Sequence, residues 1–465
     1  MASAPLRIAV VGGGITGLAA AHAVISHAGP HDPQPSNVVL FEASDRVGGK
    51  ILTTAFAGNE AIDEGADAFL ARLPWGTALA RAVGLGDQLV SPAASGAAVW
   101  WDKLHPIPEA LLLGLPTEVL ALARSSLLSW GGKLRAASEP FRRRTATAPD
   151  SLGMFVRARF GDQVHLRLVD PLVGSIYAAD TDRFSLAAIP QIADIAGSSR
   201  SVLLAGRKAR ANSKSKTVVA GPIFYTPASG MGALTTATVE AIASAGGDVR
   251  VNTPIAELAA DDLGWRVNAE RFDSVVLACP AAATANLLAI AAPDSSRILA
   301  TIPTADVALV CLAVPAADWP SRLVGLSGYL VPKPKQHLVT AVSFGSQKWT
   351  QWHVDDLMML RVSLGRDGLP VLQLTDEQLT AAAIDEVSQH LGIALRPSHV
   401  RISRWPAAFP QYRPHHAELV AAATRLLPAG LALAGASYHG IGIPACIRSG
   451  NQAAALACNR EALAD

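Results

Sequence analysis

A run of glycines near the start of the chain has the spacing of a phosphate-binding turn. Gly12, Gly14 and Gly17 stand in the order G-x-G-x-x-G. The first glycine permits a tight turn, the second lets the backbone approach a pyrophosphate, and the third lets a helix pack on a strand. The N–H groups at the start of that helix attract phosphate. The spacing therefore predicts a dinucleotide site.

An acidic residue and a second glycine segment extend this signal. Glu42 ends an apolar run and can accept hydrogen bonds from a ribose. Arg46 follows shortly, and the sequence then reads Gly48-Gly49-Lys50, which offers a second close approach of the backbone and a cation. An ordinary strand–helix–strand unit with a glycine-rich loop is the alternative, and it leaves this second segment unexplained.

The elements that must position these residues are visible in the same stretch. Residues 7–11 are apolar and predict a buried strand, residues 18–25 predict a helix, and residues 38–41 predict a second strand. The acid lies further from the glycines than the usual ~20 residues. The polar, Pro-rich stretch 27–37 accounts for the excess, and we expect it to form a surface loop.

Composition excludes several classes of function. The net charge is +1 over 465 residues, so nucleic acid is not expected as a main partner. The four cysteines are scattered without a C-x-x-C pair, which predicts reduced thiols in a cytoplasmic protein and no metal site. The start of the chain does not have the pattern of a signal peptide.

Two segments of the chain bear on contact with a membrane. No apolar run reaches ~18 residues, so no membrane-spanning helix is expected. Residues 110–123 are expected to form a helical hairpin lining a core or pocket, with contact to a membrane surface as the alternative. The basic stretch 207–216 is expected to be a solvated loop, with a lipid or partner contact as the alternative.

Several further segments together resemble one family. Read with the Arg46 segment, they are similar to FAD-binding oxidases of the amine oxidase superfamily, in particular the oxygen-dependent protoporphyrinogen and coproporphyrinogen III oxidases of haem synthesis. The resemblance runs in order through nearly the whole chain, with small-residue departures at Ala66, Ser175 and Ala179. The segments are 63–70 (DEGADAFL), 171–180 (PLVGSIYAAD), 346–349 (SQKW), 404–412 (RWPAAFPQY) and 434–444 (AGASYHGIGIP).

This resemblance implies an α/β fold of the glutathione-reductase or amine-oxidase type. A Rossmann-like FAD-binding domain would carry a β-sheet substrate domain and a helical insertion. Residues 85–218 are expected to form the helical insertion and residues 281–414 the substrate domain. The FAD-binding domain is expected to be assembled from three separate stretches, namely 1–84, 219–280 and 415–465.

The resemblance also implies which residues meet cofactor and substrate. Arg72, Ile176 and Tyr177 are expected in the substrate pocket, Arg72 near a carboxylate, with a plain surface arginine as the alternative. His439 is either an acid–base group or a structural hydrogen-bonding residue. The residues expected at FAD are Gly12, Gly13, Gly14, Ile15, Thr16, Gly17, Glu42, Arg46, Gly48, Gly49, Lys50, Ile255, Ala436, Ser437, Tyr438, Gly442 and Ile443.

The implied chemistry is oxidation of a porphyrinogen to a porphyrin. Six electrons and six hydrogens leave the substrate, FAD accepts two electrons per cycle, and O2 reoxidises it with release of H2O2. The protein has to orient a meso C–H group and exclude water, and the cofactor supplies the redox step. No catalytic side chain is therefore predicted.

Coproporphyrinogen III is the expected substrate. The chain is rich in Ala and uses Arg more than Lys, which is typical of high-GC genomes in which the coproporphyrin route is expected. Protoporphyrinogen IX is the first alternative. An amine oxidase, a carotenoid desaturase and a non-catalytic flavoprotein that carries porphyrin are further alternatives. A ferrochelatase-type enzyme is the expected downstream partner.

Overall fold

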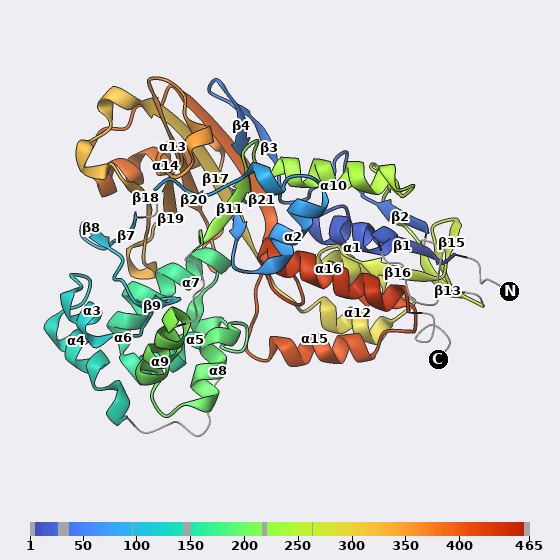
Figure 1. The fold of residues 1–465 in the computed structure, drawn as a ribbon, viewed down its shortest axis with the longest axis horizontal. Coiled ribbons are helices and arrows are strands. Elements are labelled where there is room, and N and C mark those ends of the chain that lie inside the picture. Colours follow the sequence, from blue (N-terminus) through green and yellow to red (C-terminus); the bar gives the residue numbers. More distant parts are fainter. Residues whose placement is uncertain are drawn as a thin grey trace.

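The computed structural model describes residues 5–26, 37–94, 96–142, 150–215, 221–262 and 264–459. Figure 1 shows three parts: a sheet covered by helices at the end that carries both termini, a second sheet, and a group of helices below it. Apart from Asn37, the loop predicted over residues 27–37 lies outside the described residues.

A five-stranded parallel sheet forms the centre of the first part, called here the cofactor domain. Its strand order is β12-β2-β1-β16-β22. Side chains alternate along a strand, so Ile8 and Val10 pack into one layer while Ala9 and Val11 pack into the opposite one. The strands are β1 (Arg7–Val11), β2 (Asn37–Phe41), β12 (Asp248–Arg250), β16 (Ser274–Leu277) and β22 (Leu431–Leu433).

Both faces of this sheet are covered. Helices α1 (Ile15–Ser26) and α16 (Ile443–Ala457) pack closely, since a Cβ at Gly450 would lie only 2.3 Å from the carbonyl oxygen of Thr16. Helix α10 (Gly232–Ser244) packs against α1. The opposite layer comprises strands β13 (Leu258–Asp261), β14 (Gly264–Val267) and β15 (Glu270–Phe272) with helices α11 (Ala281–Leu287), α12 (Pro293–Leu299) and α15 (His416–Arg425).

The second part, called here the substrate domain after the expectation above, is built on a seven-stranded sheet in the order β21-β17-β20-β19-β18-β7-β8. Helix α14 (Asp376–Leu391) packs on one face of it, and a capping box formed by Thr375 and Gln378 begins that helix. The strands are β7 (Gly96–Trp100), β8 (Leu104–Pro106), β17 (Thr304–Pro315), β18 (Leu326–Leu330), β19 (Val339–Phe344), β20 (Leu357–Leu364) and β21 (His399–Pro410).

Strands β7 and β8 fall within the stretch expected to be helical. They join the substrate sheet because β7 pairs in parallel with β18 and buries Ala98 and Val99.

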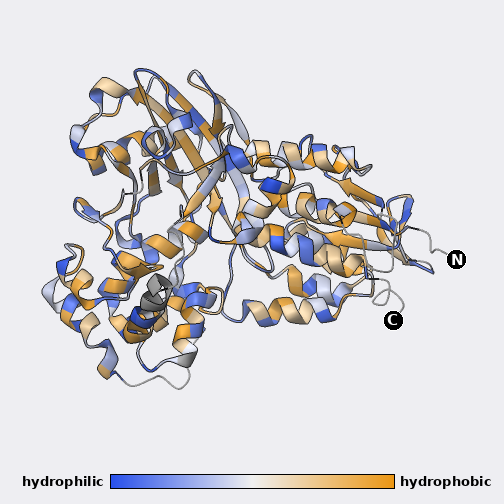
Figure 2. Ribbon diagram, viewed as in Figure 1, coloured by the Kyte–Doolittle hydropathy of each residue, from blue (hydrophilic) through white to orange (hydrophobic). Residues whose placement is uncertain are grey.

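Figure 2 shows hydrophobic residues along the strands of both sheets, as expected for buried strands. Smaller elements connect the parts: β3 (Thr53–Phe56), β4 (Asn59–Asp63), β5 (Phe69–Leu70), α2 (Pro74–Ala82), β6 (Leu89–Val90) and β11 (Phe224–Pro227).

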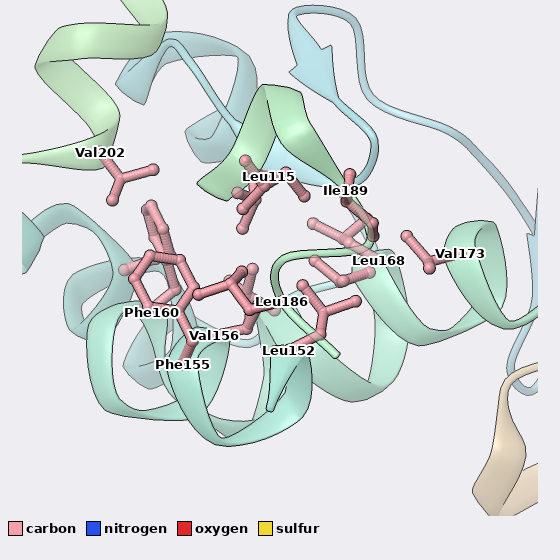
Figure 3. Packing of buried hydrophobic residues seen from close by; sticks show 14 of the residues in the cluster. Leu115, Leu152, Phe155, Val156, Phe160, Leu168, Val173, Leu186, Ile189 and Val202 are labelled. Atoms are coloured by element: carbon pink, nitrogen blue, oxygen red, sulfur yellow. The ribbon is translucent and has the colours of Figure 1, made fainter. Parts of the chain in front are cut away.

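The third part is a helical domain with its own core. Leu152, Phe155, Val156 and Phe160 of one helix point into this core, together with Leu168 (Figure 3). The prediction of a loop over residues 207–216 is wrong, because the helix α9 continues to Ser215. The helices are α3 (Val119–Arg124), α4 (Trp130–Ala137), α5 (Leu152–Phe160), α6 (Asp162–Val164), α7 (Asp170–Tyr177), α8 (Pro190–Ser198) and α9 (Val202–Ser215), with a π-helical turn over His165–Val169.

Candidate active site

A cavity of about 870 Å³ runs from the cofactor domain to the substrate sheet and α7. One half is lined by the glycine turn after β1, the segment after β2 and the loop before α16. The other half is lined by strands β17, β19, β20 and β21. Residues on the sheet side are Val307, Leu309, Thr340, Arg361, Ser363, Trp405, Ala407 and Phe409, and residues on α7 are Gly174 and Ser175.

The glycine turn leaves an open cradle at the start of α1. A Cβ at Gly17 would lie 1.9 Å from the carbonyl oxygen of Gly12, so this position needs glycine for helix–strand packing. Gly12 itself has a φ of +108°, which favours glycine. A Cβ at Gly14 would meet nothing within 4 Å. The empty space at Gly14, in front of a helix N-terminus, fits a pyrophosphate group.

Glu42 fixes the conformation of this turn. Its carboxylate accepts the Gly13 N–H at 2.6 Å and the backbone N–H and hydroxyl of Ser44 at 2.8 and 2.7 Å. Glu42 also lines the cavity, as do Ile15 and Thr16 on α1. A carboxylate oxygen can accept more than one hydrogen bond, so Glu42 can hold the turn and still accept from a ribose.

The second glycine segment joins the first. The Gly48 N–H donates to the Gly13 carbonyl at 2.8 Å, and Gly48, Gly49 and Lys50 line the cavity. Arg46 acts behind this segment: its guanidinium donates to the carbonyl oxygens of Gly49 at 2.7 Å and of Val47 and Ile51 at 3.2 Å. Arg46 therefore stabilises the loop from behind. The loop residues Gly48, Gly49 and Lys50, and not the Arg46 side chain, line the cavity.

The loop before α16 supplies the opposite wall. Ala436, Ser437 and Ile443 line the cavity, and Gly442 is the N-cap residue of α16. Tyr438 does not line it: its hydroxyl donates to the Thr284 hydroxyl at 3.0 Å within the cofactor-domain core. His439 is exposed and also lies outside the lining.

A tyrosine from the substrate domain holds this loop. The Tyr412 hydroxyl donates to the Ala436 carbonyl oxygen and accepts the Gly440 N–H at 2.9 Å. Burial raises the pKa of Tyr412, so the hydroxyl keeps its proton and can make both contacts. Ile255, which follows β12, lines the cavity on the cofactor-domain side.

The three residues expected in the substrate pocket do not line the cavity. Arg72 is exposed in the turn before α2. Ile176 on α7 is also exposed, and Tyr177 packs against Phe184 in the helical-domain core with their ring centroids 4.8 Å apart. Residues of the same segment do line the cavity, namely Gly174, Ser175 and Ala178.

Two cavity arginines were not singled out in the sequence. Arg366 forms a doubly bonded ion pair with the fully buried Asp170 of α7, with N–O distances of 3.1 and 3.3 Å. Arg361 on β20 pairs with Asp67 at 3.0 Å and donates to the Gly65 carbonyl at 2.9 Å. Neither belongs to a local motif, and only the pairing of distant strands brings them to the cavity.

Near Asp67 and Arg361 lies a buried carboxyl group with a raised pKa. Burial raises the pKa of Asp63 to about 6, although its hydrogen bond from Thr53 opposes the shift, and the neighbouring Asp67 adds to it. Because the folded pKa exceeds the unfolded value, this group favours folding at low pH and costs stability as pH rises through about 6.

We therefore expect the free energy of unfolding to depend less on pH in Asp63→Asn than in wild type, because asparagine does not titrate. Raising the pKa of Asp63 from 3.8 to about 6 corresponds to ~3 kcal/mol. The free energy of unfolding of the variant relative to wild type should therefore rise by ~2–3 kcal/mol from pH 4 to pH 8. Urea unfolding at constant FAD would measure this, with the exposed Asp355→Asn as control. Parallel curves for Asp63→Asn and wild type across this range would contradict the assignment.

These features define a flavin-dependent oxidoreductase. Residues 15–458 match the family described as flavin containing amine oxidoreductase, and the chain belongs to this family. It is 34% identical to coproporphyrinogen III oxidase of Mycobacterium tuberculosis over 97% of this chain and 96% of the relative. It is 28% identical to protoporphyrinogen oxidase of Bos taurus over 96% of this chain and 97% of the relative.

A solved structure supports the same relationship. A crystal structure from Exiguobacterium sp. 255-15, whose description names protoporphyrinogen oxidase, covers 98% of this chain and 99% of its own, with 28% identity and a TM-score of 0.82. The predicted α/β flavoprotein fold, the FAD cofactor and the resemblance to porphyrinogen oxidases are confirmed. Within the part of the chain that the structure describes, no helix is long and apolar enough to cross a membrane.

Proposed function

We propose that this chain oxidises coproporphyrinogen III to coproporphyrin III with O2 in haem biosynthesis, releasing H2O2. The observation that carries the proposal is one continuous cavity that joins the FAD cradle at Gly14 to a broad sheet wall containing Val307, Leu309 and Phe409. A large, mostly apolar macrocycle needs such a wall more than it needs an acid–base side chain. The names of the similar proteins reported above support the same substrate class.

The residues present fit FAD and the reaction. Gly12, Gly14 and Glu42 would hold the pyrophosphate and ribose, and the loop Ala436–Ser437 with the start of α16 would lie beside the ring system. When bound, FAD supplies the acceptor for two electrons per cycle. The chain contributes the apolar wall, which excludes water from the reacting meso carbon.

An amine oxidase is a further alternative within the family, after the protoporphyrinogen IX oxidases. Such an enzyme would be expected to place paired aromatic side chains beside the cofactor. Here Tyr438 points to Thr284 and away from the cavity, and the aromatic side chains Trp405 and Phe409 line it from the sheet wall. The loop before α16 therefore offers no aromatic side chain to the cavity, which favours a porphyrinogen. A porphyrin carrier without catalysis would bind the same ligand but would produce no H2O2, so turnover separates the two functions.

Location and partners follow from the same proposal. We place the enzyme in the cytoplasm and a ferrochelatase-type enzyme downstream, as the family resemblance implies. A peripheral membrane contact is supported by exposed side chains on the helical domain: Trp130 is 77% exposed, Leu134 70% and Phe141 86%. Exposed apolar residues of this size are commonly covered by a lipid or protein surface.

The choice between the two porphyrinogens has a direct test. Steady-state oxidation of coproporphyrinogen III and protoporphyrinogen IX should give the higher kcat/KM for coproporphyrinogen III, because its additional propionates can meet polar groups at the cavity. A higher kcat/KM for protoporphyrinogen IX would assign the chain to the other branch. Rapid oxidation of amines with none of porphyrinogens would reject the proposed function altogether.

A further inference from the structure

We propose that Arg361 is the residue that binds a carboxylate of the substrate. This inference rests on the proposed function, because it assumes a porphyrinogen in the cavity. It concerns a contact that determines specificity, and it begins from the cations that the structure places at the cavity wall. Among the described lining residues these are Lys50, Arg361 and Arg366.

Lys50 belongs to the cofactor half. It follows Gly48 and Gly49, whose backbone stands beside the Gly14 cradle through an isolated bridge between Gly14 and Gly48. A Cβ at Gly49 would approach the Gly14 Cα at 3.3 Å, so the two glycine segments touch. We therefore assign the Lys50 cation to the cofactor half, beside the glycines expected to meet the phosphates.

The two terminal nitrogens of Arg366 already bind protein groups. Its terminal nitrogens donate to both oxygens of Asp170, to the Gln336 side-chain oxygen at 3.3 Å and to the Ala179 carbonyl. Its side chain is 4% exposed. The pair with Asp170 is electrically neutral, and the Nε of Arg366, which has no partner within the described residues, is itself buried. Arg366 therefore has no net charge and no accessible donor to offer to a bound carboxylate.

Arg361 differs in both respects. A guanidinium carries five N–H donors. The described polar contacts of Arg361 use Nη1, which donates to the Gly65 carbonyl, and Nη2, which pairs with Asp67, while the guanidinium lies 5.8 Å from the Trp352 ring centroid. Its side chain is 12% exposed, three times the value for Arg366. Since Arg361 lines the cavity, the donors left over can reach a bound anion.

The partner of Arg361 is shared with a second cation. The Asp67 carboxylate accepts Lys348 Nζ at 2.7 Å and the Trp349 indole N–H at 2.9 Å, in addition to pairing with Arg361. The Asp67 carboxylate therefore faces two cations, and the neighbouring Asp63 adds a second negative charge only once it ionises, because its pKa is raised to about 6. Asp67 is shared between Lys348 and Arg361 and holds the guanidinium in place, which gives the S-x-K-W segment a role as a positioning element.

The position of Arg361 suits a ligand that lies on the sheet wall. Side chains alternate along β20, so Arg361 and Ser363 point to the same side, and both line the cavity. Ser363 pairs with Leu309 on the neighbouring strand β17, another wall residue. A macrocycle lying against Leu309 would bring a peripheral propionate within reach of Arg361.

The test compares Arg361→Met with wild type on two probes, coproporphyrinogen III and its tetramethyl ester. A charged hydrogen bond lost from the bound state corresponds to about a tenfold weaker binding. We expect KM for the acid to rise about tenfold in Arg361→Met with kcat nearly unchanged. The ester has no carboxylate, so its KM should be the same for both proteins.

Two further variants separate charge from structure. Arg361→Lys keeps the cation and should recover most of the lost affinity. Arg297→Met removes a 78% exposed arginine on α12 of the cofactor domain and should match wild type on both probes. Retained FAD absorbance in every variant would show that the cofactor site is intact.

Two results would overturn the assignment of Arg361. Equal KM values for the acid in wild type and Arg361→Met would show that the carboxylate contact lies elsewhere. A changed flavin midpoint potential with unchanged KM would assign the charge of Arg361 to the cofactor instead. Failure of the wild type to oxidise any porphyrinogen is a different outcome, since it would reject the proposed function and not only this contact.

Discussion

The variant Gly14→Val is expected to fold normally and to lose its FAD. A Cβ at Gly14 meets no protein atom within 4 Å, and its φ lies outside the left-handed region, so valine causes no clash in the protein itself. The space it enters is where the pyrophosphate must approach the backbone. Purified Gly14→Val should therefore be colourless, with wild-type circular dichroism and elution volume.

Two comparison variants make this result specific. Gly17→Val should fail to fold, because its Cβ would lie 1.9 Å from the Gly12 carbonyl oxygen. Gly197→Val on α8 also adds a side chain in open space, and it should stay yellow. A yellow Gly14→Val protein with a full complement of FAD would show that the phosphates do not bind at this turn.

The second large effect is expected at the buried ion pair of Asp170 and Arg366. Asp170 → Asn leaves the Arg366 guanidinium buried without its countercharge, a change that typically costs ~3–5 kcal/mol. The Thr181 hydroxyl also donates to Asp170 at 2.7 Å, so this bond is weakened as well. Urea unfolding of the FAD-bound protein should show the loss as a lower midpoint with a similar slope.

An exposed ion pair provides the comparison. Asp294 and Arg297 on α12 form a pair with side chains 61% and 78% exposed. Asp294→Asn should change the free energy of unfolding by less than ~1 kcal/mol, since exposed pairs contribute little. If Asp170→Asn were equally mild, the contact between α7 and the substrate domain would have to be held by other groups.

The cofactor half of the site could be predicted from sequence because its determinants are local. Gly12, Gly14 and Gly17 lie within one turn and the start of one helix, and Glu42 ends the next strand. Each of these residues has its role fixed by neighbours in the chain. The same argument explains why Gly48 and Gly49 were expected at the cavity, where the structure places them.

The substrate half could not be predicted in this way. Asp170 and Arg366 are 196 positions apart, and Asp67 and Lys348 are 281 apart. No periodicity or local spacing connects such residues, and their meeting depends on strand register within the seven-stranded sheet. Arg72 illustrates the limit, since its place in a family segment says nothing about whether its side chain turns toward the cavity or to solvent.

The direction of a side chain could also not be predicted in segments whose place at the site the sequence predicts. Tyr438 lies in the loop whose neighbours Ala436 and Ser437 line the cavity, yet its ring turns into the core to reach Thr284. Arg46 likewise turns back onto its own loop. In both cases the polar end of the side chain forms a hydrogen bond away from the cavity, and only the three-dimensional structure shows which group accepts it.

Aerobic turnover of coproporphyrinogen III tests the central claim most directly. The FAD-bound protein should convert it to fluorescent coproporphyrin III and release about three H2O2 per product, because six electrons leave in two-electron steps through one cofactor. Gly14→Val should do neither. Tight binding of the porphyrinogen without H2O2, or without bleaching of the flavin when air is excluded, would contradict the account.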